Sequence, residues 1–150
     1  MPSYALQVPS EYGYVLTVAA SSLFINTFHS MLTVKARKAS GLTYPIPYAS
    51  QEQAAKDPKA YQFNCAQRAH SNFTENLTPF LSALLISGLW FPTASAALGA
   101  GWVAGRTWYA AGYSAYGPQG RTKGFYISFL CDTALKVMAV IAGIKLLPQA

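Results

Sequence analysis

The sequence predicts an all-α integral membrane protein, an up-down bundle of four helices, on the strength of how few charges it has and where they lie. Only 16 of its 150 residues, or 11%, are Asp, Glu, Lys or Arg, against about 25% in soluble domains. None occurs in the 23 positions between Glu11 and Lys35, or in the 30 positions between Glu75 and Arg106. Each run reaches the roughly 20 residues that a helix needs to cross a bilayer.

The overall composition excludes two other classes of protein. Because 52% of the residues are hydrophobic, the chain is not disordered. The net charge of +6 could suggest nucleic-acid binding, but the positive charges border apolar runs and form no basic face. We therefore expect no nucleic-acid partner.

The first two spans are expected over residues 12–34 and 61–90. The first lies between Glu11 and a basic cluster of Lys35, Arg37 and Lys38. Residues 40–58, with three prolines, are typical of a loop. The second span begins near Lys59, and Pro79 inside it predicts a kink or a local break.

The last two spans are expected over residues 94–116 and 124–147, closed by Pro148. A turn of Gly117, Pro118, Gln119 and Gly120 separates them. The third span is rich in small residues, and Ala97, Gly101 and Gly105 recur at steps of four. Such a stripe allows close contact between membrane helices.

The distribution of Lys and Arg predicts the orientation. The first and third loops carry these residues, whereas the second loop and the N-terminal tail carry none. Positive loops face the cytosol, so both termini are expected on the opposite side. Short links make neighbouring spans antiparallel, as in an up-down bundle.

Two polar stripes lie within the spans. Arg68, Asn72 and Glu75 share one face of the second span, and Asn64 and Tyr61 extend it. On the third span the stripe is Arg106, Tyr109, Tyr113 and Tyr116. The alternatives are a structural ion pair of Arg68 with Glu75 and aromatic packing of the tyrosines, but ionisable residues within spans are functional by default.

Together the two stripes suit a small zwitterionic ligand with carboxylates and an amine. Arginine binds carboxylates in bidentate fashion, and a glutamate can hold an ammonium group. Asn and Tyr side chains can complete the hydrogen bonds. From the residues alone, the ligand is not defined further.

Several segments together resemble the MAPEG family of membrane proteins that use glutathione. They are FNCAQRAHSNFTE (63–75), EYGYVL (11–16), KARK (35–38), YPIPY (44–48) and GRTWYAAGY (105–113). The most similar branch is that of microsomal glutathione S-transferase 3. The resemblance implies a homotrimer of four-helix protomers in the endoplasmic reticulum, with the outer mitochondrial membrane as an alternative location. It also implies glutathione bound between protomers near the cytosolic face.

The resemblance implies a role for individual residues. Arg121 corresponds to the family arginine that activates the thiol and is the expected catalytic residue. His70 stands where the leukotriene synthase branch has Gln, and Asn76 where that branch has Tyr. The expected glutathione-binding residues are Arg37, Lys38, Arg68, His70, Asn72, Glu75, Tyr109 and Tyr113.

The expected chemistry is activation of the glutathione thiol, with glutathione as cosubstrate and no metal. A thiol with a pKa near 8.5 is only a few per cent thiolate at neutral pH. Lowering that pKa by about two units requires roughly 2.7 kcal/mol, a reasonable contribution from one guanidinium. The thiolate would conjugate a lipophilic electrophile or reduce a lipid hydroperoxide that enters from the membrane lipid, and leukotriene C4 synthesis occurs in some family members.

Some residues and one other function remain as alternatives. Cys65 and Cys131 are expected to pack as free thiols, and Asp132 and Lys136, one turn apart, to pair structurally. The alternative function is a noncatalytic membrane protein that binds lipid or acts as an adaptor. The complete set of arginines, glutamate and tyrosines favours the enzyme.

Overall fold

The computed structural model describes residues 8–147, and within this range all regular secondary structure is helical. The expectation of an all-α protein is thus confirmed, whereas Pro148 lies outside the described residues. The elements are α1 (Tyr12–Ser40), α2 (Gln51–Lys56), α3 (Pro58–Gly88), α4 (Pro92–Tyr116), the 3-10 helix η1 (Gly117–Gln119) and α5 (Thr122–Lys145).

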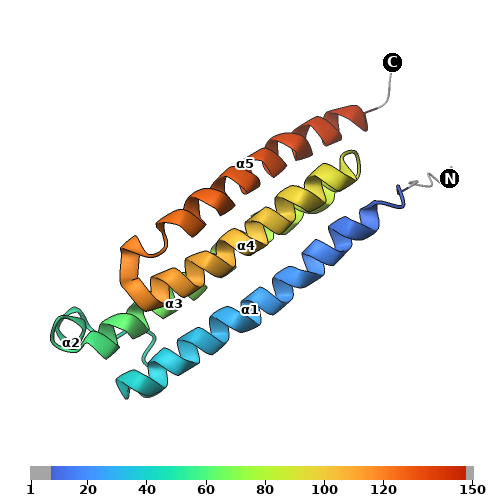
Figure 1. The fold of residues 1–150 in the computed structure, drawn as a ribbon. Coiled ribbons are helices and arrows are strands. Elements are labelled where there is room, and N and C mark those ends of the chain that lie inside the picture. The colour runs from blue at the N-terminus through green and yellow to red at the C-terminus, as the bar shows by residue number, and fades with distance from the viewer. Residues whose placement is uncertain (1–7, 148–150) are drawn as a thin grey trace.

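The four long helices lie side by side, and each runs antiparallel to the long helix before it (Figure 1). The central pair, α3 and α4, packs on α1 at one side and on α5 at the other. The short helix α2 lies at the end of the molecule where α1 ends and α3 begins. The turn from α4 to α5 is at this same end, so both polar stripes begin near it.

The first helix is longer than expected. Residues 12–34 were expected to form the span, but α1 continues through the basic cluster to Ser40. The helix ends at Gly41, whose φ of 69° is left-handed and whose N–H bonds to the Lys38 carbonyl oxygen, as is common at helix C-termini. Basic residues near a helix end also interact favourably with the helix dipole, so charge alone did not mark the boundary.

The segment between α1 and α3 is partly helical rather than a continuous loop. Ser50 and Gln53 form a reciprocal capping box that starts α2. The side chain of Asp57 accepts a hydrogen bond from the Lys59 N–H, and Pro58 occupies the first turn of α3, where its missing N–H costs nothing. Helix α3 continues through Pro79 without the local break that the sequence allowed.

Aromatic side chains fill the core between α1, α3 and α4. Phe80 stacks on Trp102 with ring centroids 3.7 Å apart, and the Phe73 ring is tilted against the same indole with 5.8 Å between the centroids. Val15 of α1 and Leu135 of α5 are fully buried in this cluster. The core holds α3 and α4 in the register that brings their polar stripes together.

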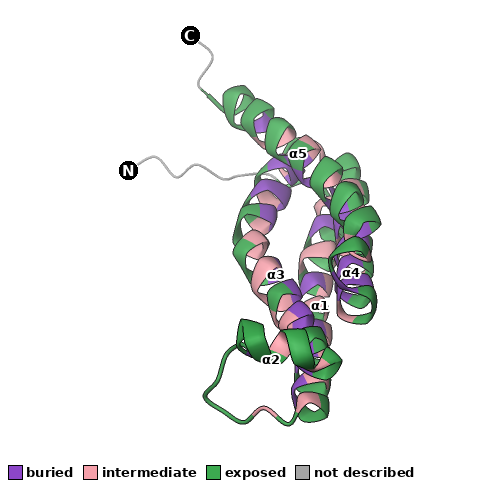
Figure 2. Cartoon of the chain, turned by 90° about the vertical axis from the view of Figure 1, so that its left-hand side faces the viewer, coloured by how far each residue is buried: buried purple, intermediate pink, exposed green. Residues whose placement is uncertain are grey.

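Two of the described helices, α1 and α5, are long and apolar enough to cross a membrane. Both helices have many exposed residues (Figure 2), and large apolar side chains are among them: Leu23, Phe24, Leu130, Val140 and Ile144. Helices α3 and α4, also expected as spans, do not meet the same criterion of length and hydropathy, and they carry the two polar stripes. The apolar outer faces indicate a membrane protein, because water-soluble proteins rarely expose so much contiguous apolar surface.

Glycines allow α4 and α5 to approach closely. A Cβ on Gly124 would contact the backbone of Tyr109 and Gly105, and a Cβ on Gly105 would lie 2.8 Å from the Ser128 nitrogen. Of the expected small-residue stripe, Gly101 and Gly105 face α5, whereas Ala97 is exposed. This close approach places Arg121, at the start of α5, over the tyrosines of α4.

Candidate functional site

An open cleft of about 300 Å³ lies where α3, α4, η1 and the first turns of α5 meet. It combines polar side chains from both predicted stripes with apolar side chains of α5. The lining residues are Asn72, Tyr109, Pro118, Arg121, Thr122, Phe125 and Tyr126. The cleft is large enough to hold part of a small-molecule ligand.

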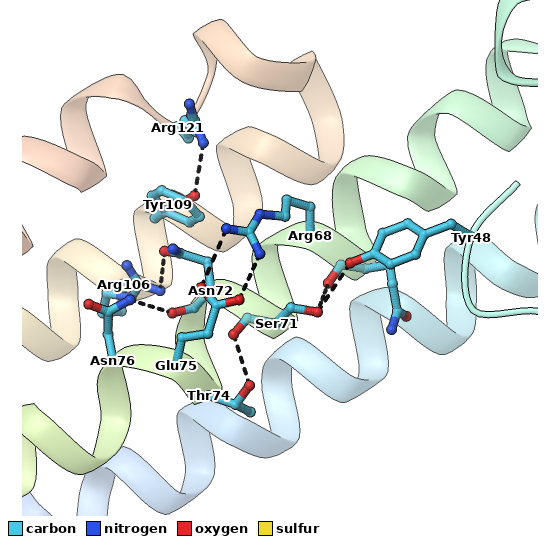
Figure 3. A network of polar contacts seen from close by, with 11 residues as sticks. Tyr48, Arg68, Ser71, Asn72, Thr74, Glu75, Asn76, Arg106, Tyr109 and Arg121 are labelled. Atoms are coloured by element: carbon cyan, nitrogen blue, oxygen red, sulfur yellow. Dashed lines mark hydrogen bonds and ion pairs between the residues drawn. The ribbon is translucent and has the colours of Figure 1, made fainter. Parts of the chain in front are cut away.

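Arg121 is held against two tyrosines of α4, Tyr109 and Tyr113, and Figure 3 shows its contact with Tyr109. Its Nη1 donates a hydrogen bond to the Tyr109 hydroxyl oxygen at 3.3 Å, and its guanidinium lies 5.0 Å from the centre of the Tyr113 ring. The hydrogen bond with Tyr109 raises the pKa of Arg121, which lies in the turn outside the spans. The guanidinium is therefore a permanent positive charge at the cleft.

Tyr109 itself is almost completely buried, with 1% of its surface exposed. Its ring stands edge-on to the Tyr113 ring, with 5.6 Å between the centroids. Arg106 lies on another side, 4.6 Å from the Tyr109 ring centre. Packing of this kind fixes the phenol in one position, so its hydroxyl presents a defined partner to Arg121.

Asn72 connects the two stripes. Its Oδ1 accepts a hydrogen bond of 3.0 Å from Nη2 of Arg106, which is itself 3% exposed. The guanidinium of Arg106 also lies near the Phe73 and Trp102 rings. A buried arginine from α4 thus holds an amide of α3 at the edge of the cleft.

Arg68 and Glu75 form an ion pair beside Asn72 (Figure 3), with 2.7 Å from Nη1 to Oε1 and 3.4 Å from Nη2 to Oε2. The ion pair that was the structural alternative for these two residues is therefore present. Their side chains are 46% and 51% exposed, and ion pairs at such exposure contribute little to stability. Both groups remain accessible to a ligand with a carboxylate and an ammonium group.

Arg37 and Lys38 are not brought to this cleft. Arg37 is buried at the end of α1, donates a 2.7 Å hydrogen bond from Nη1 to the Ile46 carbonyl oxygen, and lies over the Tyr44 and Phe63 rings. Lys38 is exposed and lines an open groove along α1. Within one chain, Arg37 fixes the segment after α1 and Lys38 points to the outer surface.

His70 faces α1 rather than the cleft. Its Nε2 lies 3.2 Å from Oδ1 of Asn26, and its ring is 6.1 Å from that of His29. The resemblance implied a glutathione contact at this position, but the single chain directs the side chain toward a different helix. His29 is 1% exposed and stacks on Phe73 at 4.6 Å between ring centroids, so it is a packed residue.

The outer members of the two stripes have other surroundings. The amide of Asn64 bonds to both backbone groups of Ala49, at 2.8 and 3.0 Å, and so ties the segment before α2 to α3. Tyr61 and Tyr116 are exposed. The predicted stripes therefore converge only over their central turns.

Two cysteines and an ion pair on α5 were also singled out from the sequence. Cys65 and Cys131 are free thiols, and Lys136 pairs with Asp132 along α5 as expected. Residues 8–147 contain no cluster of three or more His, Cys, Asp or Glu side chains that could hold a metal ion.

Sequence reasoning missed the contribution of α5 to the cleft. Thr122, Phe125 and Tyr126 line it, yet the sequence analysis assigned these residues no role. The sequence does contain a signal for this contact. Gly120 lies opposite Gly112 and Gly124 lies opposite Gly105, and such glycines allow two chain segments to approach closely.

One comparison with known proteins bears on this arrangement. The sequence model that describes the MAPEG family matches residues 15–141 of this chain. The matched range includes all of α3 and α4, most of α1 and α5, and every residue that lines the cleft.

Proposed function

Since the chain belongs to the MAPEG family, which includes glutathione transferases, we propose that it is a membrane glutathione transferase and peroxidase. Within the family, the motifs favour the branch of microsomal glutathione S-transferase 3. Glutathione is the cosubstrate, and the second substrate is a lipophilic electrophile or a lipid hydroperoxide.

The observation that carries this proposal is the Arg121 guanidinium hydrogen-bonded to Tyr109 in an open cleft. A fixed positive charge within reach of a bound thiol favours the thiolate, which is the nucleophile. Tyr109 keeps the guanidinium in place and can also donate to the sulfur.

The chemistry divides according to the second substrate. With an electrophile, the thiolate sulfur attacks carbon, a C–S bond forms and the leaving group departs with its electron pair. With a hydroperoxide, sulfur attacks the terminal oxygen, the O–O bond breaks and an alcohol leaves after protonation. The sulfenic acid so formed condenses with a second glutathione to give the disulfide and water.

Recognition of glutathione rests on the polar groups beside the cleft. The Arg68 guanidinium suits a carboxylate in bidentate geometry, and Glu75 suits the amino group of the γ-glutamyl residue. Asn72 supplies neutral hydrogen bonds. The mutual pairing of Arg68 and Glu75 keeps both side chains oriented until the ligand's charges replace it.

The arrangement in the membrane is part of the proposal. The four long helices form an up-down bundle that spans the endoplasmic reticulum membrane, with the segments 41–57 and 117–121 at the cytosolic face. Three such protomers assemble, and glutathione lies between neighbours. The exposed position of Lys38 on α1 supports a contact with glutathione held by an adjacent protomer, whereas Arg37 shapes the segment that follows α1. The His70 contact stays a prediction of the resemblance.

The test is an assay of the purified protein with glutathione against an aryl halide and a lipid hydroperoxide, alongside Arg121→Ala. We expect turnover of one or both substrates and its loss in the variant. A protein that binds glutathione but turns over neither substrate would support the alternative, a lipid-binding or adaptor member of the family. That alternative gains no specific support from the cleft, because a scaffold does not require a guanidinium fixed at its opening.

A further inference from the structure

A second, smaller cavity of about 100 Å³ lies beside the cleft, between α3, α4 and α5, and is also open. Asn72 and Phe125 line both this cavity and the open cleft. Arg106 and Asp132 lie on its walls, on α4 and α5. The second cavity thus adjoins the cleft at Asn72.

Among the described residues, four buried side-chain polar atoms have no hydrogen-bond partner, and two of them belong to residues that line the second cavity: Nε of Arg106 and Oδ1 of Asp132. Arg106 is 3% exposed and Asp132 is 9% exposed. One atom is a cationic donor and the other an anionic acceptor, and their residues line the same cavity. Leaving either without a partner would cost about 1–3 kcal/mol or more, so each requires a partner within that space.

Neighbouring polar groups are already engaged. The Ser128 hydroxyl bonds to backbone carbonyls of its own helix, and Nδ2 of Asn76 donates to the Asn72 carbonyl oxygen at 2.7 Å. A cavity of this size has room for about three water molecules at roughly 30 Å³ each. Water can donate to a carboxylate and accept from a guanidinium, so it can satisfy both atoms at once.

The other oxygen of Asp132 is paired with Lys136, one turn along α5. That pair lies toward the outside, because the Lys136 side chain is half-exposed. The two oxygens of Asp132 therefore differ: Oδ2 has a lysine partner at the surface, and Oδ1 has no partner among the described residues. The sequence spacing predicts only the pair with Lys136.

The contact between Arg106 and Asn72 fixes which way the Asn72 amide points. A guanidinium has donors and no acceptor, so the atom facing Arg106 must be the amide oxygen. The amide nitrogen, with its two donors, is then left for the other side of the group, where Asn72 borders the cleft. Any shift or rotation of Arg106 would release this orientation.

We propose that Asp132 is a positioning residue of the ligand site: through water in the second cavity it holds the Arg106 guanidinium, and Arg106 in turn holds Asn72 as a hydrogen-bond donor to the ligand. The chain of contacts joins α5 to α4 and α4 to α3. This inference rests on the proposed function only in taking glutathione as the ligand of the cleft.

The test measures glutathione binding by calorimetry for Asp132→Asn, which removes the charge and keeps the shape. We expect the Kd to rise about three- to tenfold, the effect of one impaired hydrogen bond. With turnover as a second readout, KM for glutathione should rise while kcat changes little, because Arg121 and Tyr109 are untouched. If Asp132 had a purely structural role, its substitution would lower the stability of the protein but would not raise KM selectively over kcat.

A double-mutant cycle and a matched control test whether Asp132 affects glutathione binding through Asn72. If Asp132 acts through Asn72, Asp132→Asn should have no further effect on the Kd in an Asn72→Ala background. Lys136→Gln removes the surface ion pair but retains the Asp132 carboxylate, and its Kd should equal that of the unmodified protein. Equal effects of Lys136→Gln and Asp132→Asn, or additive effects in the cycle, would overturn the inference.

Two further results have separate meanings. If the unmodified protein binds no glutathione, the proposed function fails. If it binds glutathione and Asp132→Asn binds equally well, the positioning role fails and the proposed function stands. If Asp132→Asn does not fold, the second variant is Asp132→Glu, which retains the charge and lengthens the side chain. Unchanged glutathione affinity both in a folded Asp132→Glu protein and in Asn72→Ala would also contradict the proposal.

Discussion

Nη1 of Arg121 and the hydroxyl oxygen of Tyr109 are 3.3 Å apart, although twelve positions separate the residues in the chain. The contact exists because the chain reverses through η1 and because glycines let α5 lie directly on α4. It brings a permanent cation and a buried phenol to the edge of one cleft. The proposed thiol chemistry depends on this pair.

Arg121→Ala should lower turnover strongly while leaving glutathione affinity nearly unchanged. Loss of the guanidinium returns the thiol pKa toward about 8.5, so the thiolate fraction at neutral pH falls to a few per cent. We expect roughly a 10- to 100-fold lower kcat. Stopped-flow thiolate absorbance should decrease in parallel, and an unchanged thiolate signal would show that another group activates the sulfur.

Tyr109→Phe should reduce turnover by about three- to tenfold, because it removes the hydroxyl that bonds to Arg121 and keeps the ring. Tyr113→Phe is the comparison for kcat: its ring lies 5.0 Å from the Arg121 guanidinium, an interaction with the aromatic face that phenylalanine retains in large part. Because Tyr113 is also an expected glutathione-binding residue, the loss of its hydroxyl should appear in KM. Steady-state kinetics of both variants provide the measurement. A larger loss in Tyr113→Phe would mean that the wrong tyrosine has been assigned to the guanidinium.

The sequence predicted the convergence of the two stripes better than it predicted their ends. The spacing of Arg68, Asn72 and Glu75 places them on one helical face, and the ion pair follows from that geometry. The surroundings of Arg37 and His70 depend on contacts with Ile46 and Asn26, which lie elsewhere in the chain. Helical periodicity gives the face of a residue but not the element that covers it.

The ends of the helices were likewise predicted only in part. Helix α4 ends at Tyr116, directly before the turn of Gly117 to Gly120, and the positive φ of Gly117 terminates the helix there. The basic cluster after residue 34 did not end α1, because Lys and Arg are good helix formers. The role proposed for Asp132 does not follow from helical spacing either, because it depends on a cavity formed by three helices.

Arg68→Ala should weaken glutathione binding by tenfold or more and affect kcat less. The guanidinium is exposed and can bind a ligand carboxylate with two hydrogen bonds. The protein's stability should change little, because an exposed ion pair contributes little to it. Calorimetry with Arg68→Ala and with the surface control Lys56→Ala, which also breaks an exposed ion pair, separates these effects; equal affinities in the two variants would exclude Arg68 from recognition.

The pH dependence of kcat should report the bound thiol alone. The hydrogen bond with Tyr109 raises the pKa of Arg121, so its charge is retained as the pH rises through the whole range from about 5 to 9. The guanidinium lowers the thiol pKa, and kcat should therefore rise with pH and level off above a value about two units below 8.5. In Arg121→Ala the inflection should move up to about 8.5, and an inflection that stays in place would contradict the assignment.

Gly124→Ala should disturb the site without altering any of its functional groups. A Cβ at this position would overlap the backbone of Tyr109 and Gly105, so α5 must move away from α4, at a cost of about 1–3 kcal/mol. Arg121 begins the same helix and would be drawn away from the Tyr109 hydroxyl. Gly143→Ala is the matched control, because a Cβ there meets no atom within 4 Å and alanine favours the helix. Thermal unfolding should show a lower Tm only for Gly124→Ala, and kcat should fall in that variant alone; loss of Tm with full kcat would mean that the contact between α4 and α5 supports the fold without positioning the guanidinium.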